Sequence, residues 1–248
     1  MKKADGIRVV SQRVKKSLGQ MGVAEEKISE VPIYTDNTVL LPERSPQGEV
    51  EGLEDPSMRP VKIGAYSGNK KIDKFIFLTV GRLVKVKNIK MQIEAMTETI
   101  KQRPDAELWI VGDGPERQKL KVKSYELKVE SNIKFLGWQV DLENFYRQAD
   151  VFLLTSNYEG WGLAAVEAAS YGLPIIMTNV GCAGELIKDG INGLVVPVGD
   201  QKKLTEAMGQ LIVDKELREA LGQNAAKSVR NLLNKEENLA LYKKSFEL

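Results

Sequence analysis

The sequence contains no histidine and a single cysteine among its 248 residues. Without histidine, the chain lacks the commonest general base and the commonest side-chain ligand of metals. The lone cysteine, Cys182, cannot form an intramolecular disulfide, and no histidine can activate it as a nucleophile. We therefore interpret Cys182 as a small packing residue and expect no histidine- or cysteine-dependent chemistry.

Long apolar runs and an excess of one charge are also missing. The chain is 42% hydrophobic and 28% charged, which is typical of a globular protein, and no run approaches the length of a membrane span. Lys+Arg 36 against Asp+Glu 34 is too balanced to indicate a nucleic-acid partner, although a small phosphorylated ligand stays open. Met1-Lys-Lys resembles the start of a signal peptide, but no apolar region follows it. We expect a cytoplasmic location.

From residue 74 onward, short apolar runs alternate with helical patterns. Strands are expected at 75–80, 106–111, 133–136, 151–154, 174–177 and 193–196. Helices are expected at 88–100, 115–128, 142–149 and 163–169, and from Asp200 onward. This alternation predicts an α/β fold, a Rossmann-like parallel sheet with helices on both faces. Right-handed crossovers then bring the carboxyl ends of all strands to one edge, where the functional loops should lie.

The segments before residue 74 have a different character. Residues 7–10 are expected to form a strand, and Ser11 to cap a helix that has Val14, Leu18 and Met21 on one face. Residues 41–73 begin with a stretch rich in proline and glycine, which is typical of a linker or an irregular excursion. The chain is therefore divided into three parts, 1–40, 41–73 and 74–248.

Three cations follow the strand expected at 75–80, in the segment that runs from Gly81 and Arg82 to Lys87. Cations just before a helix are unfavourable beside the positive end of its dipole unless an anion is also present. Arg82 could bind a phosphate through its forked guanidinium, with Lys87 as a point charge beside it. The segment could also be an ordinary solvated basic loop.

The stretch 155–171 links two expected strands through a loop and a helix. Gly160 and Gly162 leave the backbone uncovered before the helix, so an anion such as a phosphate could lie against its first amides. Glu159 precedes this turn, and Glu167 is the only ionisable residue in the otherwise apolar helix. Both carboxylates could face one crevice at the sheet edge, or both could be solvated.

Other glycine turns carry weaker signals. Gly112 and Gly114 begin a dinucleotide fingerprint, but Arg117 occupies its third glycine position, which argues against an NAD-binding domain. Residues 181–187 are expected to be a glycine turn that opens a short helix. Among the tryptophans, Trp161 is the one whose loop position suggests a ligand role, whereas Trp109 and Trp138 are more typical of packing residues. No metal-ligand spacing occurs in the sequence.

The order of these motifs resembles the carboxy-terminal, donor-binding domain of retaining GT-B glycosyltransferases of family 4, also called glycosyl transferases group 1. The resemblance covers about two-thirds of the chain, from Lys74 onward. It is carried by Gly81-Arg82 with Lys87, the Val-Gly-Asp-Gly-Pro run ending at Pro115, Phe-Leu-Gly137, Glu159-Gly-Trp-Gly-Leu with Glu167, Gly172-Leu-Pro174, and the run 192–197.

The resemblance implies a hexosyltransferase that uses a nucleotide-sugar, UDP- or GDP-linked, retains the anomeric configuration and needs neither a cofactor nor a metal. Arg82 and Lys87 would hold the donor diphosphate, Glu159 the sugar hydroxyls and Glu167 the ribose. The remaining residues implied in donor binding are Gly81, Gly137 and Trp138, the last two near the base, and Gly160, Trp161, Gly162 and Leu163 around the phosphates and sugar.

The chain also departs from the family pattern. Trp161 stands where the family usually has phenylalanine, and Ile33-Tyr34-Thr35 replaces its usual Asn-Gly-Val at the crossover between domains. Residues 1–40 look like a remnant of the acceptor-binding domain, most of which lies outside this sequence. A non-catalytic nucleotide-binding module that acts with a partner protein is therefore an alternative.

The acceptor is not encoded in recognisable residues. A sugar, a lipid-linked sugar or a small molecule could each serve, and a lipid-linked acceptor would bring the chain to the inner face of the membrane. A separate acceptor-domain polypeptide could complete the cleft, or the chain could self-associate through its first helix and the segment 239–246.

Overall fold

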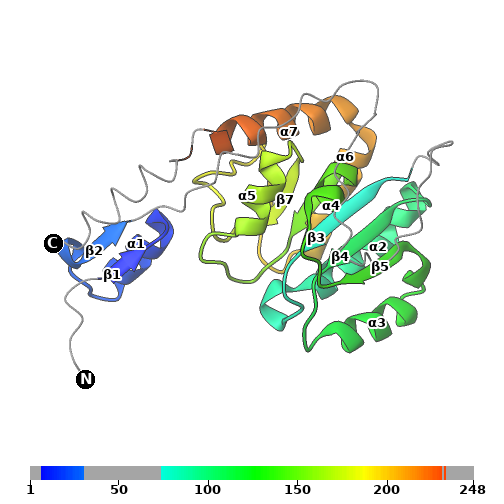
Figure 1. Cartoon of the computed structure of the whole chain (residues 1–248), viewed down its shortest axis with the longest axis horizontal. Coiled ribbons are helices and arrows are strands. Elements are labelled where there is room, and N and C mark those ends of the chain that lie inside the picture. The colour runs from blue at the N-terminus through cyan, green and yellow to red at the C-terminus, as the bar shows by residue number, and fades with distance from the viewer. Residues whose placement is uncertain (1–6, 31–73, 231, 233–248) are drawn as a thin grey trace, which may run out of the picture.

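The structure, a computed structural model, describes residues 7–30, 74–230 and 232. Residues 7–30 form a small strand-helix unit, and residues 74–230 form the sheet domain (Figure 1). The predicted linker at 41–73, the crossover residues 33–35 and the segment 239–246 lie outside the described residues.

The strand-helix unit pairs two short parallel strands, β1 (Ile7–Val9) and β2 (Ile28–Glu30), beside helix α1 (Gln12–Gln20). Ser11 caps α1 as expected, because its hydroxyl accepts a 3.2 Å hydrogen bond from the amide of Val14. The expectation that Met21 shares the apolar face of α1 was wrong. The helix ends one residue earlier, and the Met21 side chain is exposed.

Six parallel strands form the sheet of the sheet domain, in the spatial order β5-β4-β3-β6-β7-β8. Their bounds are β3 Ile76–Val80, β4 Glu107–Val111, β5 Ile133–Gly137, β6 Val151–Leu154, β7 Ile175–Thr178 and β8 Leu194–Val196. Every strand predicted from the sequence is present, with ends that differ by at most one residue. The parallel α/β fold is thereby confirmed.

Six helices of the sheet domain cover both faces of this sheet (Figure 1). They are α2 (Ile89–Gln102), α3 (Arg117–Glu126), α4 (Glu143–Gln148), α5 (Leu163–Ser170), α6 (Gln201–Val213) and α7 (Lys215–Arg230). Alternate residues of each central strand face opposite ways, so Leu78 joins a core with α4, α5 and α7, while Phe77 joins a core with α2, α3 and α6. Burial on both faces accounts for the nearly continuous apolar strands.

One predicted element is absent from the described fold. Residues 181–187 make turns and an isolated bridge between Ala183 and Ile187 instead of a helix. The amides of Glu185, Leu186 and Ile187 all converge on the carbonyl of Cys182, at 2.9–3.2 Å. A helix would require each amide to use a different carbonyl, so this convergence folds the segment into a compact turn.

Candidate functional site at the carboxyl edge of the sheet

The direction in which the chain adds strands to the sheet reverses between β3 and β6. From β3 the chain adds β4 and β5 on one side, and then returns to add β6, β7 and β8 on the other. The loops after β3 and β6 therefore diverge and leave a crevice, which is the usual place for a ligand in an open parallel sheet. Except for Glu167, which lies in the middle of α5, the site residues predicted from the sequence lie at this carboxyl edge or at the start of α5.

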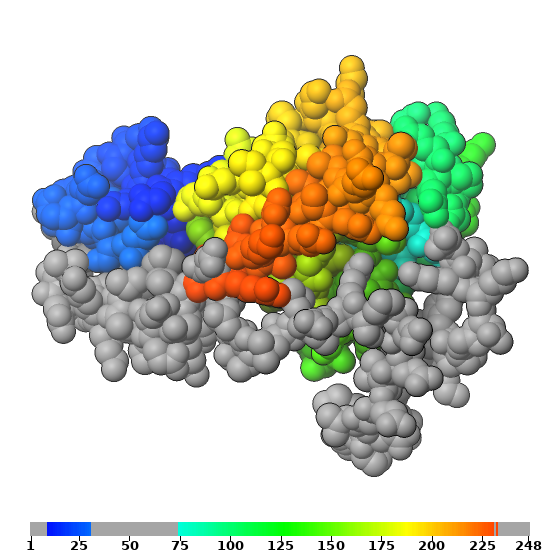
Figure 2. All heavy atoms as spheres, turned by 90° about the horizontal axis from the view of Figure 1, so that it is seen from above, coloured from blue at the N-terminus to red at the C-terminus, as the bar shows by residue number. Residues whose placement is uncertain are grey.

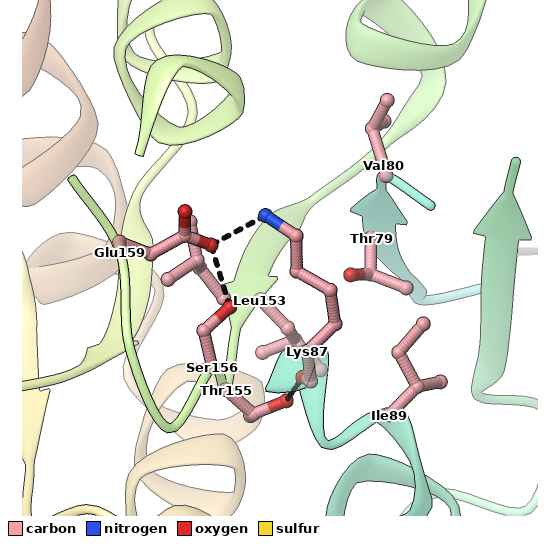
Figure 3. A pocket seen from close by; sticks show the side chains of 10 residues that line it. Thr79, Val80, Lys87, Ile89, Leu153, Thr155, Ser156 and Glu159 are labelled. Carbon is pink, nitrogen blue, oxygen red and sulfur yellow. Dashed lines mark hydrogen bonds and ion pairs between the residues drawn. The ribbon is translucent and has the colours of Figure 1, made fainter. Parts of the chain in front are cut away.

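The centre of the crevice is an ion pair between Lys87 and Glu159. The Lys87 ammonium lies 2.5 Å from a carboxylate oxygen of Glu159, and the hydroxyl of Ser156 donates to the same oxygen at 2.6 Å. Figure 3 shows the Lys87 and Glu159 side chains pointing toward one another from opposite walls of a small pocket. The pair joins the loop after β3 to the loop after β6.

A second set of hydrogen bonds holds these two loops together beneath the ion pair. The Thr155 hydroxyl lies 3.1 Å from the carbonyl oxygens of Lys87 and Asn88, and the buried amide of Gln92 donates to Thr155 at 2.8 Å. The amide of Asn157 also donates to the carbonyl of Val86 at 2.7 Å. Lys87 and Glu159 thus project from a braced backbone.

Arg82 differs from Lys87 in its surroundings. Its side chain is exposed and forms no ion pair with any described residue, whereas Lys87 is partly buried and paired. A guanidinium free to reorient beside a fixed ammonium can close on an anion from the solvent side.

Glycines form the floor of the crevice on the β4 side. The amide of Gly112 donates to the carbonyl of Gly137 at 2.6 Å, and the amide of Gly81 to the carbonyl of Val111 at 2.9 Å. A Cβ atom at Gly112 would lie 2.0 Å from the carbonyl oxygen of Gly81, so no side chain fits there. The strand ends can therefore approach each other, and bare backbone is presented to the crevice.

The start of α5 offers uncapped amides. Gly162 is the N-cap residue, with a φ of 92°, and no side chain caps the helix. The first amides of α5, beginning with that of Leu163, are left without side-chain partners among the described residues, and the helix dipole adds positive potential there. Gly160 and Gly162 bring this end of the helix to the side of Glu159.

Glu167 has its own partner on a neighbouring helix. The Tyr146 hydroxyl donates a 2.9 Å hydrogen bond to the Glu167 carboxylate. Burial of Tyr146, together with the Glu167 charge, raises the pKa of the phenol far above its ordinary value, so the hydroxyl remains a donor. Its ring stacks on Tyr171 at 5.1 Å between centroids.

The tryptophans reverse the expected exposure. The Trp161 side chain is only 7% exposed and packs in the core under α5, whereas Trp138, after β5, is 73% exposed. The indole N–H of Trp161 finds no hydrogen-bond partner among the described residues. Trp138 is thus the ring available at the surface, and Trp161 is a core residue.

Four supporting residues were not predicted from the sequence: Gln92, Thr155, Ser156 and Tyr146. Ser156 lies three residues before Glu159, and this spacing could have suggested a hydrogen bond within the loop. Gln92 and Tyr146 act across 63 and 21 residues respectively. Nothing in their local sequence marks them.

The described residues contain neither a cluster of metal ligands nor a helix that could span a membrane. No three side chains of histidine, cysteine, aspartate or glutamate gather there in a way that could hold a metal ion. Across residues 7–30 and 74–230, no helix has the length and apolar character required to traverse a membrane.

Comparison with known proteins identifies the family of the chain. The family model for "Glycosyl transferases group 1" matches residues 66–228. The chain belongs to the group 1 glycosyl transferases. The expected resemblance is confirmed at that level.

Two curated relatives each match about two-thirds of this chain. The lipopolysaccharide core biosynthesis glycosyltransferase LpsE of Rhizobium meliloti (strain 1021) is 30% identical over 161 residues, which cover 65% of this chain and 46% of LpsE. The N-acetyl-alpha-D-glucosaminyl L-malate synthase of Bacillus anthracis is 32% identical over 167 residues, covering 67% and 44%. This chain spans less than half the length of either relative.

Two solved structures share the fold. Anabaena Alr3699/HepE in complex with UDP-glucose superposes with a TM-score of 0.80 at 20% identity, over 100% of this chain and 65% of that one. The C-terminal domain of a glycosyl transferase group 1 family protein (LpcC) from Francisella tularensis gives a TM-score of 0.59 at 29% identity, over 63% and 84%.

Proposed function

We propose that this chain is the donor-binding half of a retaining hexosyltransferase of family 4, and that it holds a UDP- or GDP-sugar in the crevice between β3 and β6. The observation that carries the proposal is the Lys87–Glu159 pair beside the uncapped start of α5. Together these groups offer a fixed cation, a carboxylate and free amides within one crevice. A nucleotide-sugar carries the complementary groups: a diphosphate and sugar hydroxyls.

The cations have a chemical role in this proposal. Transfer breaks the bond between the anomeric carbon and the diphosphate, and the electron pair leaves with the phosphate oxygen. Lys87, Arg82 and the first amides of α5 stabilise the negative charge that develops there. The acceptor hydroxyl then forms the new bond on the same face of the sugar and passes its proton to the departing phosphate oxygen. This arrangement needs no bound metal.

The other residues recognise the rest of the donor. Glu159 accepts hydrogen bonds from the sugar hydroxyls, and Glu167 accepts them from the ribose. The base lies against the backbone of Gly137 with Trp138 beside it, since that exposed ring follows β5 at the same edge. The backbone of Gly81, and of 160–163, surrounds the phosphates and sugar.

The acceptor is a sugar, a lipid-linked sugar or a small molecule, and it enters from the side of residues 7–30. A lipid-linked acceptor would place transfer in the cytoplasm at the inner face of the membrane. The non-catalytic alternative gains no observation in its favour.

A thermal-shift screen of the chain against UDP, GDP, ADP and NAD tests the donor site. We expect one nucleoside diphosphate to raise the melting temperature, and the shift to be lost in Arg82→Ala and Glu167→Ala. Lys101→Ala is the matched control, because Lys101 is an exposed cation in the last turn of α2, at the opposite edge of the sheet. A shift by NAD alone, or none with any nucleotide, would contradict the proposal.

A further inference from the structure

The strand-helix unit is hydrogen-bonded to the sheet domain through Arg13. The Arg13 guanidinium donates to the carbonyl oxygen of Asn179 at 2.6 Å, to the Asn179 side-chain oxygen at 2.7 Å, and to the carbonyl of Ala183 at 2.9 Å. These contacts join residues at least 166 positions apart in the sequence. Figure 2 shows the blue surface of the unit against the yellow surface that contains this loop.

A reciprocal contact runs in the opposite direction. The Glu185 carboxylate accepts hydrogen bonds from the amides of Gln12 at 3.2 Å and Arg13 at 3.1 Å. These are the first amides of α1, where a negative charge is favoured by the helix dipole. The Arg13 side chain thus binds the loop 179–185, and the Glu185 side chain binds the start of α1. We call this pair of contacts the clamp, and it opposes sliding of α1 along the loop in either direction.

The loop held by this clamp supports the loop of Glu159. The amide of Cys182 donates to the carbonyl of Trp161 at 2.8 Å. Gly181 has a φ of 55°, and a Cβ atom there would lie 2.4 Å from the Trp161 carbonyl oxygen and 3.0 Å from the Cβ of Glu159. The two loops therefore pack backbone to backbone with no room for adjustment.

Burial makes this junction inert. Cys182 is fully buried, and burial raises the pKa of its thiol to about 12. The thiol stays protonated and packs as a small apolar side chain between the clamp and the loop at 159–161. Because Gly181 and Cys182 contact Trp161 and Glu159 directly, a shift of the loop 179–185 displaces those two residues.

We propose that Arg13 and Glu185 are positioning residues. When the strand-helix unit is seated, that is, docked on the loop 179–185, their hydrogen bonds fix the position of the backbone at 159–161. The inference rests on the proposed function in taking that backbone as part of the donor site. Seating of the unit and occupation of the crevice then favour each other, because coupling between two sites is reciprocal. Residues of the proposed acceptor side of the cleft thus determine the position of the backbone on the donor side.

Hydrogen exchange of the whole chain tests the coupling without any ligand. In Arg13→Ala we expect the amides of Cys182 and Ala183, and those of Ala165 and Val166 that donate to the Gly162 carbonyl, to exchange about three- to tenfold faster, as for loss of about one net hydrogen bond. Amides in Ile89–Gln102 should not change. Arg13→Lys should restore part of the protection, because an ammonium can still reach a carbonyl. Lys16→Ala, an exposed change on the same helix, is the matched control.

Two results would overturn the inference. One is faster exchange at 179–185 with no change at Ala165 and Val166, which would mean that the loops are uncoupled. The other is an equal loss of protection throughout the sheet domain. That result would mean that the clamp stabilises the whole domain and does not act on one loop. Titration of UDP and GDP into wild type and Arg13→Ala then separates the two proposals. Absence of binding to wild type refutes the donor site and leaves the exchange result standing, whereas several-fold weaker binding to Arg13→Ala supports both.

Discussion

Lys87 and Glu159 neutralise each other across the crevice, with 2.5 Å between the ammonium and the carboxylate. The Glu159 side chain is 11% exposed and the Lys87 side chain 30%, so the pair is shielded from water on one side. A diphosphate that binds Lys87 must compete with this carboxylate. The pair therefore ties the strength of phosphate binding to the position of Glu159, and this relation gives predictions of opposite sign for the two residues.

Lys87→Ala should weaken binding of the nucleoside diphosphate that the thermal screen identifies by about ten- to a hundredfold, the range expected for one charge-assisted hydrogen bond. The loss has two sources, since the ammonium is gone and the Glu159 carboxylate now repels the phosphate. Isothermal titration calorimetry at constant salt measures it. Lys101→Ala should bind the nucleotide as tightly as the wild type does. If Lys101→Ala weakened binding as much as Lys87→Ala, the loss would come from the change in overall charge.

Glu159→Gln should have the opposite effect on the free nucleotide. The amide keeps the shape and a hydrogen bond from Ser156, but it no longer competes for Lys87. UDP or GDP without sugar should therefore bind as well as to wild type or more tightly, while the corresponding nucleotide-sugar loses its hydroxyl contacts and gains nothing over the free nucleotide. The ratio of the two dissociation constants is the measurement. Parallel weakening of both ligands would contradict a sugar-facing role for Glu159.

Tyr146→Phe should weaken nucleoside diphosphate binding severalfold with little change in stability. The ring keeps its stacking on Tyr171, but Glu167 loses the hydroxyl that holds its carboxylate in place. A double-mutant cycle with Glu167→Ala, read by calorimetry, provides the control. In the Glu167→Ala background the Tyr146 change should cost nothing more, and a full additional loss there would mean that the hydroxyl acts independently of Glu167.

The sheet could be predicted because its signal is local. Each strand is an apolar run bounded by turn residues, and the predicted ends at 151–154 match β6 without error. The glycines and charges of the crevice could be located for the same reason, since they follow those strands. The fold class was thus available from the sequence alone.

The contacts that organise the site could not be predicted, because they join distant residues. Nothing near Tyr146 indicates Glu167, and nothing near Arg13 indicates the loop at 179–185. The helix expected at 181–187 failed for a related reason: three amides share the carbonyl of Cys182, a geometry that residue type does not encode. The exposure of Trp138 and burial of Trp161 likewise depend on which loop packs under α5.

Removal of divalent metal should leave nucleotide binding unchanged. In the proposed site, Arg82, Lys87 and the α5 amides supply the positive potential that a bound cation supplies in other transferases. Calorimetric titrations of UDP and GDP in EDTA and in magnesium should give the same affinity. Binding that appears only with magnesium would contradict this assignment of the charges.

Stability against acid should depend on Glu107 in β4. Burial alone would raise the pKa of this carboxyl, but hydrogen bonds from Lys74 and Trp109 and the charges of Lys74 and Lys134 outweigh it and hold the pKa below its ordinary value of 4.5. The stabilisation is therefore fully present at neutral pH and is lost as the pH falls below about 4.5, through the lowered pKa of the folded state.

Glu107→Gln should remove this pH dependence and lower the free energy of unfolding at pH 7 by roughly 1–3 kcal/mol, because Lys74 loses its charged partner at 2.6 Å. Urea unfolding between pH 3 and pH 7, followed by circular dichroism, measures both effects. Glu98→Gln is the matched control, since that carboxylate pairs with Lys101 in the last two turns of α2 and is half exposed. A wild-type chain whose stability between pH 7 and pH 3 runs parallel to that of Glu107→Gln would show that the ion pair does not hold the carboxylate in its charged form.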